Sequence, residues 1–257
     1  INSMKYLATL FLICTTITVC SQNIITDRPD QTEASSTVPK NSFQIEMGIL
    51  AQTSSNKAVT NFAGPSTLIR YGISEKVELR LFNQYESNKI ELEGGNIKAN
   101  GLGDIEIGTK IQLFKKGGVN TEIAFLSHAI IPTSKDELSN NSLGTINKLS
   151  ISHSINEQIG VGYNIGYDNV NKVSALTYSI AIGFSLSEKF GLYIEPYGAL
   201  SEGNQFESNF NAGITYLAKN NLQLDVSYGT GLNNDMEYVS AGFSWNIPEF
   251  LMNNNKN

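Results

Sequence analysis

The stretch DIEIGTKIQL, residues 104–113, alternates two kinds of side chain along its whole length. One kind is mainly apolar: Ile105, Ile107, Thr109, Ile111 and Leu113. The other kind is polar or small: Asp104, Glu106, Gly108, Lys110 and Gln112. Successive side chains of a β-strand point to opposite faces, so this period of two predicts a strand with one apolar and one polar face.

The same alternation recurs from Phe43 almost to the end of the chain, and turn residues separate its repeats. Sustained period-two patterning predicts an all-β protein, and an even number of segments fits a closed antiparallel sheet. Twelve segments can be delimited: 43–53, 59–72, 75–86, 102–115, 119–132, 143–154, 157–168, 174–187, 189–201, 206–218, 221–231 and 236–247.

Two architectures produce this pattern, namely a soluble sandwich or barrel and a transmembrane barrel. Charged residues make up only 16% of the chain, below the roughly 25% usual in soluble domains. The segments have the length of bilayer-spanning strands, and short turns alternate with longer loops such as 87–101 and 133–142. We therefore predict a transmembrane, antiparallel, up-and-down β-barrel of about 12 strands over residues 43–247.

The N-terminal region resembles an export signal. Met4 and Lys5 precede a short apolar stretch, and a small residue, Ser21, follows Cys20. We expect a signal peptide over 1–21, with residues 1–3 non-native or upstream, and therefore an exported protein of a Gram-negative outer membrane. Acylation of Cys20 is the alternative for this segment. Residues 22–42 would then be a periplasmic segment and 248–257 a polar tail.

Several classes of function lack support in the sequence. The net charge is −6 and basic residues do not cluster, which argues against nucleic acid as a partner. We find no nucleotide-binding loop, zinc-ligand spacing or nucleophile motif. The two histidines, His128 and His153, are expected at opposite ends of the barrel and on opposite faces. We therefore expect no cofactor, no metal and no enzyme activity.

Charged residues on the polar face of the segments should point into the lumen. They can form a network of paired charges that closes the barrel, or they can line a selective passage. An open and an occluded lumen are both consistent with this strand number. The candidate lumen residues are Glu46, Arg70, Glu78, Arg80, Asp104, Glu106, Lys110, Glu122, Lys148, Glu195 and Asp225.

The stretch TDRPDQTE, residues 26–33, is unusually charged and lies just before the first segment. Pro29 disfavours a helix here. We predict a gate or plug formed by Asp27, Arg28, Asp30 and Glu33, in which Arg28 meets lumen acids. The three acids of the stretch would meet Arg70 or Arg80. A solvated tether is the alternative.

The lead-in IITDRPDQTEASSTVPKNSFQIEMG, residues 24–48, resembles the start of a family of Gram-negative outer-membrane proteins. The family is named after the meta-cleavage pathway of phenol degradation, and its members begin with a TDRPD-like stretch followed by a Val-Pro turn. The resemblance implies an outer-membrane barrel that moves small, hydrophobic or aromatic compounds.

The last segment resembles the signal that the barrel-assembly machinery reads. Ser240, Gly242, Trp245 and Ile247 match its polar, glycine, aromatic and hydrophobic positions, although the chain continues past Ile247. Membrane lipid and this machinery are therefore the expected partners, besides an unidentified small solute.

Three functions remain open at this point. The first is a passive channel or transporter for small molecules. The second is a closed structural or adhesion barrel that works through loops 87–101 and 133–142, and the third is a barrel enzyme.

Overall fold

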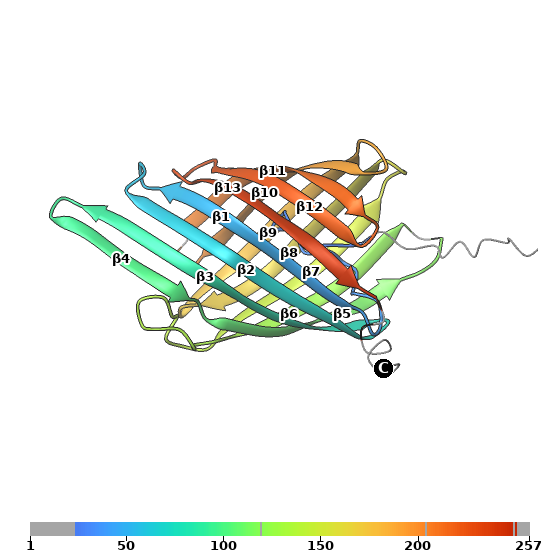
Figure 1. Ribbon diagram of the computed structural model, residues 1–257, viewed down its shortest axis with the longest axis horizontal. Helices are drawn as coiled ribbons and strands as arrows, with labels where there is room; N and C mark the ends of the chain where they lie inside the picture. The colour runs from blue at the N-terminus through green and yellow to red at the C-terminus, as the bar shows by residue number, and fades with distance from the viewer. Residues whose placement is uncertain (1–23, 119, 204, 249, 251–257) are drawn as a thin grey trace, which may run out of the picture.

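The computed structural model describes residues 24–118, 120–203, 205–248 and 250 (Figure 1). The predicted signal peptide with Cys20 and most of the predicted tail lie outside these residues. Within them the chain forms thirteen strands: β1 (Phe43–Ser54), β2 (Val59–Ser74), β3 (Val77–Leu92), β4 (Gly95–Leu102), β5 (Ile105–Lys115), β6 (Thr121–Ile131), β7 (Gly144–Ser154), β8 (Ile159–Val170), β9 (Val173–Ser185), β10 (Phe190–Ser201), β11 (Gln205–Lys219), β12 (Leu222–Gly231) and β13 (Glu237–Ile247).

Twelve of the strands seen in the described residues close into one antiparallel barrel. Each pairs with its sequence neighbours, β1 also pairs with β13, and β3 pairs with β5 beyond the β4 hairpin. The prediction of a 12-stranded up-and-down barrel is therefore confirmed. No helix within the described part of the chain is long and apolar enough to cross a membrane.

The thirteenth strand corrects one expectation. We predicted a polar loop over 87–101, but β3 continues to Leu92 and β4 returns along it from Gly95 to Leu102. The two strands form a long hairpin that projects beyond the barrel rim (Figure 1). Its turn at Gly94 and Gly95 suits glycine, since Gly95 has a φ of 143°.

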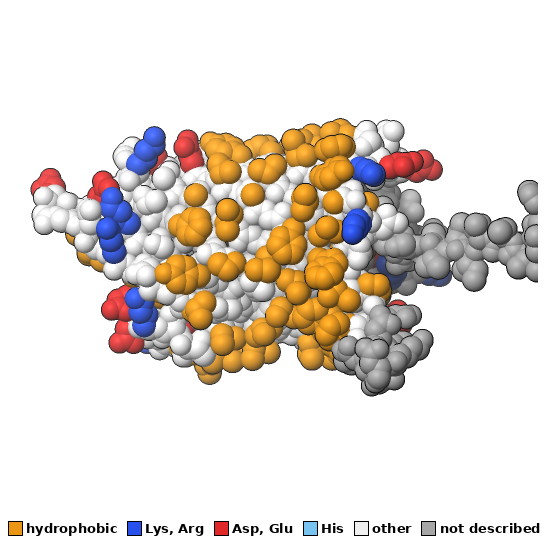
Figure 2. Space-filling model, in the orientation of Figure 1, with side chains coloured by type: hydrophobic (Ala, Val, Ile, Leu, Met, Phe, Trp, Pro, Cys, Tyr) orange, Lys and Arg blue, Asp and Glu red, His pale blue; other side chains and the backbone are white. Residues whose placement is uncertain are grey.

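The outer wall is apolar and the interior is polar. A broad band of hydrophobic side chains covers the face of the barrel in Figure 2, with charged groups gathered at its two ends. Ile107 and Leu113 are exposed on this wall, whereas Lys110 on the same strand is fully buried. Apolar side chains toward lipid and polar side chains inward are the arrangement of a transmembrane barrel.

A β-bulge in β2 interrupts the alternation of the segment predicted over 59–72. Gly64 and Pro65 together oppose the single residue Ile49 of β1 and the single residue Tyr85 of β3. One extra residue reverses the facing of everything beyond it. The side chain of Asn61 consequently shares a face with Asn88, to which it donates a hydrogen bond of 2.7 Å.

Candidate functional site

Residues 24–42, which we call the strap, run inside the barrel and follow its wall. Successive strap residues bind successive strands in descending order, because the strands lie side by side in sequence order. Arg28 binds β12, Thr32 binds β10 and β9, and Glu33 binds β8. Beyond them Ser35 binds β7, Ser36 binds β6, the Val38 N–H donates to Glu78 of β3, and Lys40 forms a bridge to Gly72 of β2.

The carboxylate of Asp27 is the centre of a buried ionic cluster. Arg80 Nη1 lies 2.6 Å from Asp27 Oδ2, Lys110 Nζ lies 2.8 Å from Oδ1, and Arg70 Nη1 lies 3.2 Å from Oδ2. Burial alone would raise the pKa of Asp27, but these three cations hold it well below its ordinary value. The strap is thereby anchored to β2, β3 and β5 by a charge that stays ionised.

Two lumen carboxylates complete the cluster. Glu46 accepts from Arg70 at 2.9 Å and also from the backbone N–H groups of Asp27 and Arg28. Glu78 bonds both Arg70 and Arg80 at 2.9 Å. Buried charges are tolerated when they are paired and hydrogen-bonded, and each member of this cluster meets that condition.

Asp27 also closes a loop within the strap. The backbone N–H of Ala34 donates to Asp27 Oδ1 at 2.8 Å, which brings the two ends of residues 28–33 together. We call these six residues the flap. The flap starts and ends beside the ionic cluster and reaches across the lumen to the opposite wall.

The tip of the flap is held by hydrogen bonds to polar side chains of that wall. Glu195 accepts from the N–H of Gln31 at 2.9 Å and from the hydroxyl of Thr32 at 2.6 Å. Thr32 Oγ1 also lies 2.8 Å from Ser179 Oγ, and the N–H of Glu33 donates to Asn164 Oδ1 at 2.7 Å. These contacts include no ion pair, in contrast to the cluster around Asp27.

Asp30 differs from the other charges of the flap. Its carboxylate has no cation within 4 Å among the described residues, and it lies near Glu195. Burial, with the negative charge of Glu195, raises the pKa of Asp30 well above its ordinary value. The seated flap therefore favours the protonated form of this group.

Arg28 fixes the flap to the neighbouring strands β12 and β13. Its guanidinium bonds Asp225 Oδ1 at 2.8 Å and Ser240 Oγ at 3.1 Å. A Cβ atom at Gly48 or Gly242 would overlap this guanidinium, so glycine at both positions provides the space for it.

Cavities lie on both sides of the flap. Toward the longer loops, one cavity of about 230 Å³ is lined by Arg28 and Glu33, and another of about 290 Å³ is lined by Gln31. Toward the short turns, cavities of about 440 and 280 Å³ are lined by Asp30. The flap thus separates loop-side from turn-side cavities.

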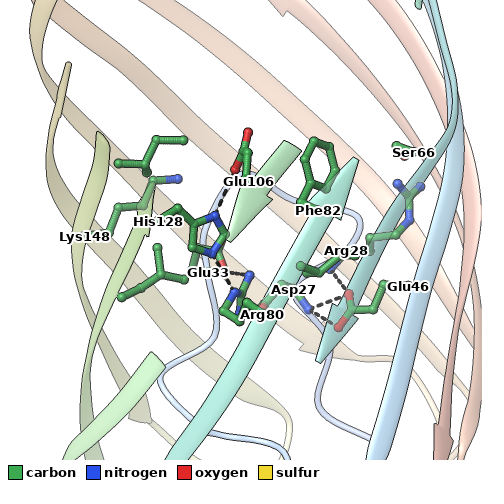
Figure 3. A pocket seen from close by; sticks show the side chains of 13 residues that line it. Asp27, Arg28, Glu33, Glu46, Ser66, Arg80, Phe82, Glu106, His128 and Lys148 are labelled. Atoms are coloured by element: carbon green, nitrogen blue, oxygen red, sulfur yellow. Dashed lines mark hydrogen bonds and ion pairs between the residues drawn. The ribbon is translucent and has the colours of Figure 1, made fainter. Parts of the chain in front are cut away.

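The first loop-side cavity contains a chain of hydrogen bonds, drawn in Figure 3. Arg80 Nε donates to His128 Nε2 at 2.9 Å, so the proton of the neutral ring belongs on Nδ1, which lies 2.9 Å from Glu106 Oε2. Both ring nitrogens are thereby occupied. Lys148 lines both loop-side cavities, and within the described residues no carboxylate lies within 4 Å of its ammonium.

The structure places the lumen candidates from the sequence in three different locations. Those brought together around the strap are Glu46, Arg70, Glu78, Arg80, Lys110, Glu122, Glu195 and Asp225. Glu106 and Lys148 line the loop-side cavities instead. Asp104 requires a correction, because its carboxylate accepts hydrogen bonds from the 133–142 loop at the rim.

Of the predicted gate residues, Asp27 binds Arg70 and Arg80, Glu33 binds Arg80, and Asp30 binds neither. Three uncharged residues that hold the flap tip were not among the candidates from the sequence, namely Thr32, Asn164 and Ser179. Period two places Asn164 and Ser179 on the lumen face, but nothing in their own sequence distinguishes them from other polar wall residues.

Comparison with known families places the chain. A family model described as "Putative MetA-pathway of phenol degradation" matches residues 26–247, which include residues 26–42 of the strap and all the described strands. The chain belongs to this family. No curated protein matches this family member.

Solved structures share the barrel of this family member at low identity. The KdgM porin in complex with disordered oligogalacturonate is 12% identical, with a TM-score of 0.53 over 79% of this chain and 98% of that one. The NanC porin is 8% identical, with a TM-score of 0.53 over 77% and 98%. The β-domain of the Bordetella autotransporter BrkA is 11% identical, with a TM-score of 0.50 over 80% and 99%. These likenesses concern the fold.

Proposed function

We propose that this protein is a passive channel of the outer membrane for small solutes and that the flap is its gate. The observation that carries the proposal is the position of the flap between loop-side and turn-side cavities. Movement of six residues would join these cavities into one passage. The name of the family favours small aromatic compounds as solutes.

The attachment of the flap at Asp27 differs in kind from the one at its tip, which supports a hinged opening. At Asp27 the flap is tied to three cations in a buried cluster. Removing one partner from such a cluster costs about 3–5 kcal/mol. At the tip, Glu195, Ser179 and Asn164 provide hydrogen bonds, each of which contributes on the order of 1–3 kcal/mol. The tip bonds can therefore be broken one at a time while the cluster around Asp27 stays intact.

A disulfide between flap and wall tests this gate. The hydroxyl oxygens of Thr32 and Ser179 lie 2.8 Å apart, so a Thr32→Cys/Ser179→Cys variant can be bridged. In planar bilayers we expect the oxidised variant to be silent and the reduced variant to conduct. Ser127→Cys/Asn147→Cys is the matched control, because these residues are bonded to each other across β6 and β7 on the outer face of the wall, whereas their neighbours His128 and Lys148 face the lumen. Its conductance should not depend on reduction.

Two outcomes would reject parts of the proposal. If oxidation of the flap pair does not change the conductance, the flap is not the gate. Silence of the unmodified chain and of every variant would favour the alternative, a closed barrel that works through its projecting β3–β4 hairpin and its other loops.

Assembly of the barrel and the role of His128 belong to the same proposal. The final strand β13 carries Ser240, Gly242, Trp245 and Ile247, the pattern that supports recognition by the barrel-assembly machinery. Substitution of Trp245 by alanine should lower the amount of folded protein in the outer membrane. We assign no catalytic role to His128, whose ring nitrogens are engaged by Arg80 and Glu106.

A further inference from the structure

The fixed charges of the loop-side cavities do not balance. Most charges of the lumen face an opposite charge. Asp27, Glu33, Glu46 and Glu78 face Arg70, Arg80 and Lys110, so this cluster keeps one net negative charge. Arg28, which lines the first loop-side cavity, is paired with Asp225. These pairs contribute little net potential to a solute in the passage.

Four groups remain outside such pairs. Glu106 lines the first loop-side cavity, Asp168 and Glu207 line the second, and Lys148 lines both. None of the four lies within 4 Å of an opposite fixed charge among the described residues, since the partner of Glu106 is the neutral ring of His128. Three carboxylates therefore face one ammonium in the part of the lumen that a solute enters first.

The first cavity also has an apolar wall beside its carboxylate. Leu68, Phe82, Leu126 and Ile146 line it together with Glu106. Figure 3 shows Phe82 and Glu106 on the same side of this space. A carboxylate next to an aromatic ring and aliphatic side chains suits a cation that carries an apolar body.

We infer that the channel selects cations and that its solute class is a small organic cation with an apolar body. The inference rests on the proposed channel function and narrows its substrate. Unpaired carboxylates in a low-dielectric passage concentrate cations and exclude anions. Lys148 lines both cavities. Its ammonium weakens this preference and repels the cationic group of the solute from its own surroundings.

Reversal potentials in planar bilayers test the inference. The unmodified chain and the Thr32→Ala variant, whose flap tip is weakened, are measured under a KCl gradient. We expect potassium to be preferred over chloride by roughly tenfold. The Glu106→Gln/Asp168→Asn/Glu207→Gln variant should lose most of this preference, and Lys148→Gln should increase it. Glu202→Gln, which changes an exposed charge in the β10–β11 turn, should leave the preference unchanged.

Permanently charged organic ions of similar size test the solute class. Benzyltrimethylammonium replaces potassium in one measurement, and benzenesulfonate replaces chloride in the other. We expect the cation to carry current and the anion to carry little. Preference for chloride, equal permeability, current carried by benzenesulfonate, or an unchanged preference in the triple variant would each overturn the inference. Absence of any current in both chains would instead reject the proposed channel and the inference with it.

Discussion

The backbone N–H of Ala34 donates a hydrogen bond to Asp27 Oδ1, at a distance of 2.8 Å, and this contact makes a loop of the residues between them. The same carboxylate binds Arg80 and Lys110 of the barrel wall. One buried side chain therefore shapes the flap and anchors it. Loss of this anchor can be tested separately from loss of the hydrogen bonds at the flap tip.

Replacement of Asp27 by asparagine keeps the size of the side chain and removes its charge. Arg80 and Lys110 then lose a counter-ion, and the second oxygen becomes a donor that faces donors. We expect the strap to be destabilised by about 3 kcal/mol while the barrel stays folded. Hydrogen exchange of residues 27–34 should accelerate by roughly a hundredfold, as measured by mass spectrometry.

The matched control for this variant is Glu188→Gln in the exposed β9–β10 turn, which should not alter exchange in the strap. If exchange of residues 27–34 is unchanged in Asp27→Asn, the ionic cluster does not hold the strap.

The flap should open as the pH rises. Burial and the charge of Glu195 raise the pKa of Asp30 in the seated flap. Protonation is therefore favoured in the closed state, and this contribution to closure is lost as the pH rises through the raised pKa. Asp27 and Glu33 add to the negative field at Asp30, and the ionised Asp27 anchors the flap down to its own lowered pKa.

We expect the conductance of the unmodified chain to increase with pH across this window. Asp30→Asn should be insensitive to pH there and should stay closed, because the amide cannot ionise. A conductance that decreases with rising pH, or a pH dependence that persists in Asp30→Asn, would contradict this account.

The hydroxyl of Thr32 should set how often the flap is open. It donates to Glu195 Oε1 at 2.6 Å, and hydrogen bonds to charged groups contribute about 1.5–3 kcal/mol. Thr32→Ala should therefore raise the open fraction by roughly tenfold or more in single-channel records. Thr32→Ser keeps the hydroxyl and should conduct as the unmodified chain does; equal effects of the two substitutions would point to packing instead.

The alternation of the sequence was sufficient to predict the barrel and the inward direction of Arg70 and Lys110. It works because period two is imposed by the strand itself, wherever the strand lies. The period is interrupted within β2, because the bulge at Gly64 and Pro65 inserts one residue and reverses the facing of the residues beyond it, including Asn61. A proline inside a long strand segment was the available signal for that bulge.

The charged residues of the candidate site could be predicted from the sequence, but the residues that bind the flap tip could not. Opposite charges in the strap and on the lumen face predicted that Asp27, Asp30 and Glu33 would meet Arg70 or Arg80, and Asp27 and Glu33 do so. The bonds from Thr32 to Glu195 and Ser179 depend on how far the flap reaches across the lumen, which its sequence does not encode locally. The β3–β4 hairpin was not predicted, because its alternating residues extend β3 beyond the strand length that is needed to cross a bilayer.

Asp104 should order the 133–142 loop at the rim of the barrel. One carboxylate oxygen accepts from the N–H groups of Thr133 and Ser134, both at 3.0 Å, and the other accepts from Ser139 and Asn140. Desolvation opposes the charge, but these hydrogen bonds outweigh it and lower the pKa of Asp104. The ordered loop is therefore stabilised above the ordinary pKa of aspartate and loses this contribution as the pH falls through the lowered value.

The Asp104→Asn substitution replaces one carboxylate oxygen with an NH2 group. This hydrogen-bond donor would then face two donors of the loop. We expect hydrogen exchange in residues 133–142 to accelerate by roughly tenfold near neutral pH and to lose its acid dependence. The strands should exchange as before. Asp136→Asn, in the same loop, is the control, since Asp136 accepts a hydrogen bond from Asn141 through its backbone carbonyl. Equal effects of the two substitutions would mean that loop charge, rather than the hydrogen bonds of Asp104, orders this part of the rim.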